Sequence, residues 1–194
     1  MAKNAVLPIT GDPKADALLV RDPLALLIGM LLDQQVTMEW AFAAPAKLAE
    51  RLGGKLDAAA IATMSPDALE AVFRDKPALH RYPNTMARRT QLLCQMLVDR
   101  YGGKADRVWT KATTGEDLLD RLQELPGFGN EKARIFLALL AKRMGVRPPG
   151  WEAAALPFSD DQHRSVADVD SAESLQQVRA FKKAMKAAGK GKDG

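Results

Sequence analysis

Apolar and polar positions repeat along most of the chain with the spacing of helices. Segments such as SPDALEAVF place apolar residues every three or four positions, which is typical of an amphipathic helix. The segment DPLALLIGMLLDQ, which begins at Asp22, is apolar on nearly all sides and is predicted to be a central buried helix. Helices are predicted at residues 13–20, 22–34, 37–52, 65–73, 86–101, 114–125, 130–144 and from about 170 into the tail.

No segment alternates between apolar and polar residues over the length of a strand, so the fold is predicted to be all-α with two helical lobes. The chain has 194 residues, of which 47% are apolar, enough for one core or for two small lobes that share one. We expect a helical domain at residues 1–150 with a hairpin at 114–144. Residues 151–194 are expected to form an irregular loop, a final helix and a basic tail that pack on the same domain.

The sequence contains no run of about 18 apolar residues, which a membrane-spanning helix needs. The first residues, MAKNAVLPITGDPKADALL, lack the charged and then apolar segments of a signal peptide. We therefore expect a cytoplasmic protein, a monomer with no membrane partner.

Cysteine and histidine are too scarce for several kinds of site. The single cysteine, Cys94, excludes an internal disulfide and an iron–sulfur cluster, which needs about four cysteine ligands. The two histidines, His80 and His163, are far apart in the sequence, so a zinc site is not expected. Cys94 lies in the apolar helical segment TQLLCQMLV and is predicted to be buried. No metal and no cofactor are predicted.

Positive charge gathers at the end of the chain. The net charge is +4, and the last segment, RAFKKAMKAAGKGKDG, carries six Lys or Arg residues and one acid. A solvated helix end explains this segment, and so does non-specific contact with phosphates. The sequence leaves both interpretations open.

A hairpin of two amphipathic helices is predicted in EDLLDRLQELPGFGNEKARIFLALLAKRMG, joined by Leu125–Gly129. Gly127 and Gly129 allow positive φ and leave the backbone bare of side chains. The amides of such a turn, next to a helix N-terminus, can bind a phosphate oxygen, and Lys132 adds a cation nearby. Phe128 is expected to point into the core. The alternative is an ordinary helical hairpin with a glycine turn.

The motif LPGFGNEKA resembles the helix-hairpin-helix of the HhH-GPD DNA glycosylase superfamily, which usually reads L-P-G-hydrophobic-G-x-x-[TS]-A. The matching residues are Leu125, Pro126, Gly127, Phe128, Gly129 and Ala133. About ninety residues upstream, LLIGMLLDQQVTMEWAFAAPAKLAERLGG resembles the start of the 3-methyladenine (AlkA-like) branch. There the matching residues are Leu32, Gln34, Gln35, Val36 and Thr37, followed by Arg51 and Leu52.

This resemblance implies double-stranded DNA with damaged bases as the partner. At the Gln35 position, members of the family insert a side chain into the duplex to fill the space left by a flipped nucleotide. Gln34 is the neighbouring candidate for contact with DNA. Helix capping or hydrogen bonding in the core is the alternative role for both side chains.

The family cleaves the glycosidic bond with the help of an aspartate about twenty residues after the hairpin. Glu152 has the expected spacing, in the first turn of a short predicted helix. Asp170 has the matching local sequence, Val-Asp-Ser, but comes some twenty residues late, and it could instead be a helix N-cap. Asp168 is a third candidate. The remaining alternative is that the catalytic carboxylate is absent.

The resemblance also bears on the type of reaction. Members with lyase activity carry a lysine where this chain has Glu131, and Lys132 lies one step further round the helix, so a monofunctional enzyme is favoured. The absence of cluster cysteines separates the chain from the endonuclease III branch. Trp40, Trp151 and Tyr82 are the candidates for stacking on a flipped base, although they and Trp109 could belong to the core instead.

The sequence therefore favours a nucleoid-associated DNA glycosylase that removes a damaged base, such as an alkylated one, by hydrolysis. The first alternative is a non-catalytic DNA-binding protein on the same scaffold. The second is an all-α protein that uses its hairpin for another partner.

Overall fold

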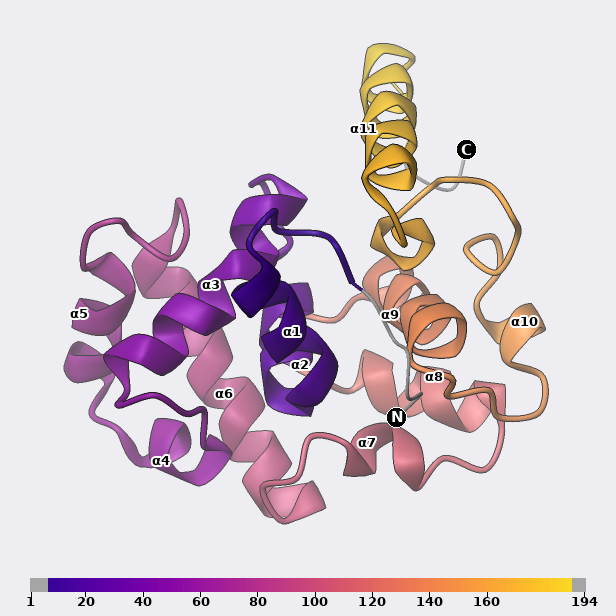
Figure 1. Ribbon diagram of the computed structural model, residues 1–194. Helices are drawn as coiled ribbons and strands as arrows, with labels where there is room; N and C mark the ends of the chain where they lie inside the picture. The colour runs from indigo at the N-terminus through magenta and orange to yellow at the C-terminus, as the bar shows by residue number, and fades with distance from the viewer. Residues whose placement is uncertain (1–6, 190–194) are drawn as a thin grey trace. The chain divides into compact units, whose positions relative to one another are not determined.

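The computed structural model describes residues 7–189, and within this range the chain forms helices and no strand (Figure 1). The helices are α1 (Pro13–Arg21), α2 (Pro23–Leu32), α3 (Met38–Arg51), α4 (Ala58–Thr63), α5 (Pro66–Arg74), α6 (Pro83–Tyr101), α7 (Arg107–Thr110), α8 (Gly115–Gln123), α9 (Asn130–Arg143), α10 (Trp151–Ala154), the 3₁₀ helix η1 (Val166–Asp168) and α11 (Ala172–Ala187). The predicted all-α fold is confirmed.

The chain divides into two compact helical units. The N-terminal unit comprises Thr10–Val108 and Leu125–Gly127. The C-terminal unit comprises Trp109–Glu124, residues 128–189 and residues 7–9. The boundary expected at residue 150 lies inside the C-terminal unit, and the division into domains at that residue stays a prediction.

Helix α2 is the centre of the N-terminal unit, and nine of its ten residues are buried. The Asp22 carboxylate caps it by accepting the N–H of Leu24 at 2.9 Å. Helix α3 packs on α2 at Gly29, where a Cβ would lie 2.8 Å from Cδ1 of Phe42, so only glycine permits this approach. Although α2 is strongly apolar, no helix within residues 7–189 is long and apolar enough to cross a membrane.

Helix α6 packs against α4 and α5 in the same unit. Gln91 of α6 donates its Nε2 hydrogen to the carbonyl oxygen of Met64 at 2.7 Å, just beyond α4. Cys94 is fully buried on α6, as predicted. The long helix thus serves as a support for the segments that precede it.

Helices α8 and α9 pack against each other in the C-terminal unit, with Phe136 of α9 in the core. The Phe136 ring meets Trp109 edge-on at 6.0 Å and Phe128 at 5.8 Å between centroids. Trp109 is therefore a core residue and is excluded as a base-stacking residue. Helix α11 packs on η1, and Figure 1 shows that it projects away from α8, α9 and α10.

Several element boundaries differ from those predicted. Helix α6 begins at Pro83 rather than near residue 86, because proline is well suited to the first turn of a helix. The segment from residue 151, expected to be an irregular loop apart from the short helix predicted at Glu152, contains α10 and also η1. The short helices α4 and α7 were not predicted, since segments of six and four residues carry little periodic signal.

Candidate DNA-binding surface and active site

The turn between α2 and α3 presents Gln35 to solvent in a strained backbone conformation. Its φ is 55°, and within residues 7–189 it is the one residue other than glycine with positive φ. That left-handed conformation costs a non-glycine residue about 1 kcal/mol or more. Within the described part of the chain, no hydrogen bond is made by the Gln35 side chain, which is exposed. The turn thus holds a free amide outward at an energetic cost.

The neighbouring Gln34 is committed to the protein. Its Nε2 donates to the carbonyl oxygen of Leu31 at 2.6 Å, and its Oε1 accepts from Nη1 of Arg89 at 2.6 Å. Both ends of the amide are therefore used to hold the turn. This arrangement corresponds to the hydrogen-bonding alternative for Gln34, whose contact with DNA stays a prediction.

His80 ties the loop before α6 to the same turn. The backbone N–H of Tyr82 donates to Nδ1 of His80 at 3.0 Å, so Nε2 carries the proton and donates it to the carbonyl oxygen of Gln34 at 2.9 Å. His80 is fully buried, so the segment RDKPALHRYP is anchored in the protein interior at this residue. Arg51 holds the same loop by donating to the carbonyl oxygen of Pro77 at 2.9 Å.

A pocket of about 340 Å³ opens beside this turn. It is lined by Gln34, Gln35, His80, Tyr82, Thr85, Met86 and Arg89. The rings of Trp40 and Tyr82 flank His80 at 6.4 and 6.1 Å between centroids. Both rings are partly exposed, Trp40 by 40% and Tyr82 by 42%, so they are available for stacking. Trp151, the third predicted stacking residue, belongs to the C-terminal unit and is half-buried.

The predicted hairpin is present, with α8 and α9 joined by Glu124–Gly129. Gly127 has a φ of +82° and uses the conformational freedom that glycine allows, whereas Gly129 has a φ of −77°, which other residues also adopt. Gly129 is the N-cap of α9, and a Cβ at this position would meet no protein atom within 4 Å. Neither backbone conformation nor packing requires glycine at 129. A bare backbone open to an approaching ligand is a reason that remains.

The other hairpin residues are arranged around this bare turn. Phe128 points into the core, as predicted, and only 4% of it is exposed. The Nζ atom of Lys132 lies 5.9 Å from the centre of the Phe128 ring. Gly127 and Gly129 are both exposed. Pro126, which directly precedes Gly127, is half-buried.

The hairpin turn lies against the end of α2. A Cβ at Gly127 would be 2.5 Å from Cδ1 of Leu31 and 3.8 Å from Nε2 of Gln34. Both contacts are within the N-terminal unit. Gly127 of the hairpin motif thus lies beside Leu31 and Gln34 of the motif about ninety residues upstream.

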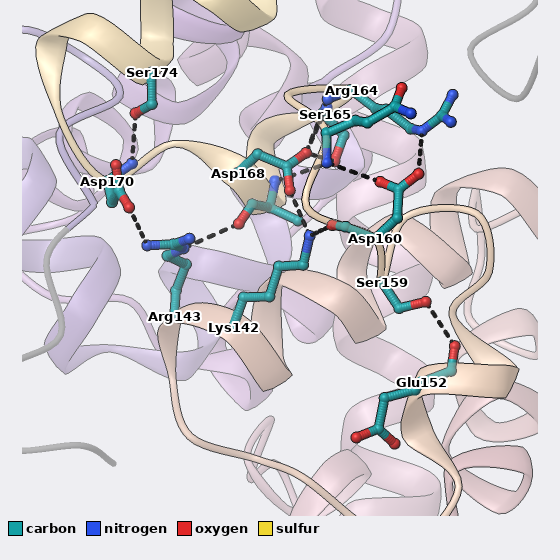
Figure 2. A network of polar contacts seen from close by, with 12 residues as sticks. Lys142, Arg143, Glu152, Ser159, Asp160, Arg164, Ser165, Asp168, Asp170 and Ser174 are labelled. Carbon is teal, nitrogen blue, oxygen red and sulfur yellow. Dashed lines mark hydrogen bonds and ion pairs between the residues drawn. The ribbon is translucent and has the colours of Figure 1, made fainter.

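Asp170 and Asp168 belong to a polar network that holds the segment before α11 to the end of α9 (Figure 2). Oδ2 of Asp170 accepts from Nη1 of Arg143 at 2.9 Å, and Nε of Arg143 donates to the carbonyl oxygen of Ala167 at 3.0 Å. Burial raises the pKa of the Asp170 carboxyl, but hydrogen bonding by Ser174 and Arg143 outweighs it, so the pKa lies below its usual value. Asp170 is therefore an ionised carboxylate with one oxygen fixed and its side chain 52% exposed.

The helix N-cap is not Asp170, as one alternative held, but Ser171, whose hydroxyl accepts the N–H of Ser174 at 3.1 Å. Asp170 directly precedes this cap, and the positive end of the α11 dipole favours its charge. Its carboxylate is held by the side chains of Arg143 and Ser174 and does not cap the helix backbone.

Both carboxylate oxygens of Asp168, in contrast, accept hydrogen bonds from the protein. Its Oδ1 accepts from Nζ of Lys142 at 2.6 Å, and its Oδ2 accepts the backbone N–H groups of Arg164 and Ser165 at 3.0 and 2.9 Å. Lys142 also donates to the carbonyl oxygen of Asp160. Asp168 is buried, and this geometry suits a structural role.

Glu152 lies in the first turn of α10, as predicted, but no group within residues 7–189 positions its carboxylate. Its side chain is exposed, and only its backbone oxygen is bound, by the Ser159 hydroxyl at 2.7 Å. Figure 2 shows its carboxylate directed away from the Asp168 and Asp170 network. Within residues 7–189, no three His, Cys, Asp or Glu side chains gather in a way that could hold a metal ion.

Sequence reasoning missed the side chains that hold these groups in place. Arg89 and His80 fix the Gln34–Gln35 turn, and Arg143 fixes Asp170. Each acts on a partner 27 to 55 residues away in the chain, and no local motif marks such pairs.

Comparison with known proteins assigns the family. Residues 28–190 match the model of the HhH-GPD superfamily base excision DNA repair protein. Two solved structures, a trapped endonuclease III–DNA covalent intermediate with an estranged adenine and a non-covalent endonuclease III–DNA complex, are each 20% identical to the chain with a TM-score of 0.46. They cover 85% and 86% of this chain and 87% of their own. No curated protein matches the sequence significantly. The chain belongs to the HhH-GPD superfamily of base excision DNA repair proteins.

Proposed function

We propose that this protein is a monofunctional DNA glycosylase, which hydrolyses the N-glycosidic bond of a damaged base flipped out of duplex DNA. The proposal rests on family membership and on one observation in particular. Gly127 of the hairpin lies beside Leu31 and Gln34, in the unit that also carries the exposed amide of Gln35.

The hairpin supplies the contact with the sugar–phosphate backbone. The amides around Gly127 and Gly129 carry no side chains that would keep a phosphate away, and they lie at the positive end of the α9 dipole. Lys132, one turn into α9, adds a positive charge. These groups fix the register of the protein on the duplex without reading its sequence.

Gln35 enters the duplex where the damaged nucleotide leaves it. Its amide can both donate and accept a hydrogen bond, so it can pair with the base that has lost its partner. The strained conformation of Gln35 supports this role, because the surrounding structure holds the side chain outward at a cost that the fold alone does not explain.

Asp170 is the carboxylate that the geometry favours for the chemical step. Cleavage of the glycosidic bond develops positive charge on the sugar, and an ionised carboxylate stabilises that charge or orients the attacking water. Arg143 binds Oδ2 and keeps the carboxylate ionised, and the Asp170 side chain is 52% exposed, so a substrate can approach it. Glu152, exposed and without a positioning contact, is the weaker candidate.

Hydrolysis without strand cleavage is favoured because the position of the family's lyase lysine is Glu131. We place the chain with the 3-methyladenine branch on the DQQVT segment. Trp40 and Tyr82, with their partly exposed rings, suit an alkylated and electron-poor base, and Trp151 is a further candidate.

The test is base release from duplexes with alkylated, deaminated or oxidised bases, or abasic sites, each with and without alkali. Strand breaks that appear only after alkali support a monofunctional glycosylase and identify its substrate. Breaks that form without alkali contradict the monofunctional assignment.

A second candidate function is that of a DNA-binding protein that has lost the chemistry. It is favoured by the pairing of Asp170 with Arg143, whose positive charge opposes the stabilisation of a cationic sugar. This candidate predicts tight binding to duplex DNA without base release from any of the substrates.

A further inference from the structure

We propose that one face of α11 binds the phosphates of duplex DNA, as a second contact in addition to the hairpin. The face consists of Arg179, Lys182, Lys183 and Lys186, and we call it the α11 basic face. The inference rests on the proposed binding of duplex DNA, but it does not depend on base release.

Helix α11 leaves much of its surface free for a partner. Only Ser174 and Val178, in the first half of the helix, are buried. From Arg179 to Ala187 every residue is at least partly exposed. Figure 1 shows this half projecting away from α8, α9 and α10.

The four basic residues lie on one side of the helix. They occupy positions i, i+3, i+4 and i+7, which fall within about 100° around a helix of 3.6 residues per turn. The partly buried apolar side chains of this half, Phe181 and Met185, lie on a different side.

The basic side chains of this face are spaced three or four residues apart, so like charges lie next to one another on the helix. The acid of α11 is Glu173, at the opposite end of the helix. The phosphate backbone of DNA is complementary in charge to this face.

The dimensions of the α11 basic face suit a nucleic-acid backbone. With a rise of about 1.5 Å per residue, positions i to i+7 cover roughly 10 Å, a length along which each DNA strand carries about three phosphates. Lys183 and Lys186 are both exposed, and neither forms an ion pair within the described residues, so both are available for phosphates.

The test measures binding of the full chain to an undamaged duplex over a range of salt concentrations. The variant Lys183→Gln/Lys186→Gln removes two charges from the face, and Lys14→Gln/Lys47→Gln removes two exposed charges from α1 and α3 as a matched control. We expect the slope of log K against log salt to become shallower by about 1.8 in the first variant, since each phosphate contact contributes about 0.9. The control should keep the slope of the unmodified protein.

Equal slopes for the two double variants would overturn the proposal, whether or not the protein releases a base. If the protein binds an RNA duplex of the same length more tightly than the DNA duplex, the proposal is also overturned, because the preferred ligand of the face would then be RNA. Failure of this proposal would therefore appear as equal salt slopes for the two double variants. Failure of the proposed function would appear instead as the expected difference between the slopes without base release. If the protein binds no duplex at all, both proposals fail.

Discussion

At the scale of single residues, Gln35 and Asp170 each present a polar side chain to solvent. Gln35 combines a left-handed backbone with a side chain that bonds to no described residue. Asp170 combines an ionised carboxylate with a side chain that is 52% exposed. The adjacent residues Gln34 and Asp168 have neither property, because their polar atoms are bound by the protein.

Replacing Gln35 should separate stability from function. Gln35→Gly removes the strain of the left-handed conformation, so the free energy of unfolding should stay the same or rise by up to about 1 kcal/mol. Base release should fall by roughly tenfold, because the amide that fills the duplex is lost. Thermal unfolding and single-turnover base release measure the two effects. Gln35→Asn, which keeps an amide and tolerates this conformation, is the control.

The ion pair of Asp170 predicts a pH dependence. The pKa of Asp170 is lowered, so its carboxylate is ionised, and any stability it adds is lost only as the pH falls through that lowered pKa. Arg143→Met removes hydrogen bonds and a positive charge, so the pKa should rise and the acidic limb of the rate profile should move to higher pH. Arg143→Lys should restore part of the shift. An acidic limb at the same pH in all three proteins would show that Arg143 does not act on the catalytic group.

Cys94 should be unreactive in the folded protein. Burial raises the pKa of its thiol to about 12, so roughly one molecule in ten thousand carries the thiolate at pH 8. A thiol reagent should modify the native chain very slowly and the unfolded chain at once. Rapid modification of the native protein would mean that α6 opens locally.

At the scale of elements, the two glycines of the hairpin turn have different roles. Gly127 is required by the fold, both for its positive φ and for its approach to Leu31. Gly129 is required by neither. The two glycines can therefore be used to tell a structural effect from an effect on DNA binding.

Gly129→Ala should weaken duplex binding by about tenfold or more, because a methyl group then stands where the phosphate approaches, while the free energy of unfolding stays the same or rises. Gly127→Ala should lower the free energy of unfolding by at least about 1 kcal/mol, since it adds strain and a clash with Leu31. Calorimetry and fluorescence anisotropy give the two quantities. Unchanged DNA affinity in Gly129→Ala would rule out the turn as a phosphate site.

At the scale of the whole molecule, the sequence predicted the helical fold and the hairpin because both depend on local patterns. Periodic apolar positions indicate helices, and the Pro-Gly-Phe-Gly turn ends one helix and starts the next. The sequence did not rank Asp170 above Glu152, since the difference lies in the contact with Arg143, 27 residues away. It also did not show that Gly127 meets Leu31, which is a matter of tertiary packing.

The measurement that tests the account most directly is single-turnover base release by the unmodified protein, Asp170→Asn and Glu152→Gln on the same damaged duplex. We expect Asp170→Asn to lose at least about 100-fold in rate while its affinity for the duplex is kept, and Glu152→Gln to remain close to the unmodified protein. Equal rates for Asp170→Asn and the unmodified protein would contradict the assignment of Asp170 as the catalytic carboxylate.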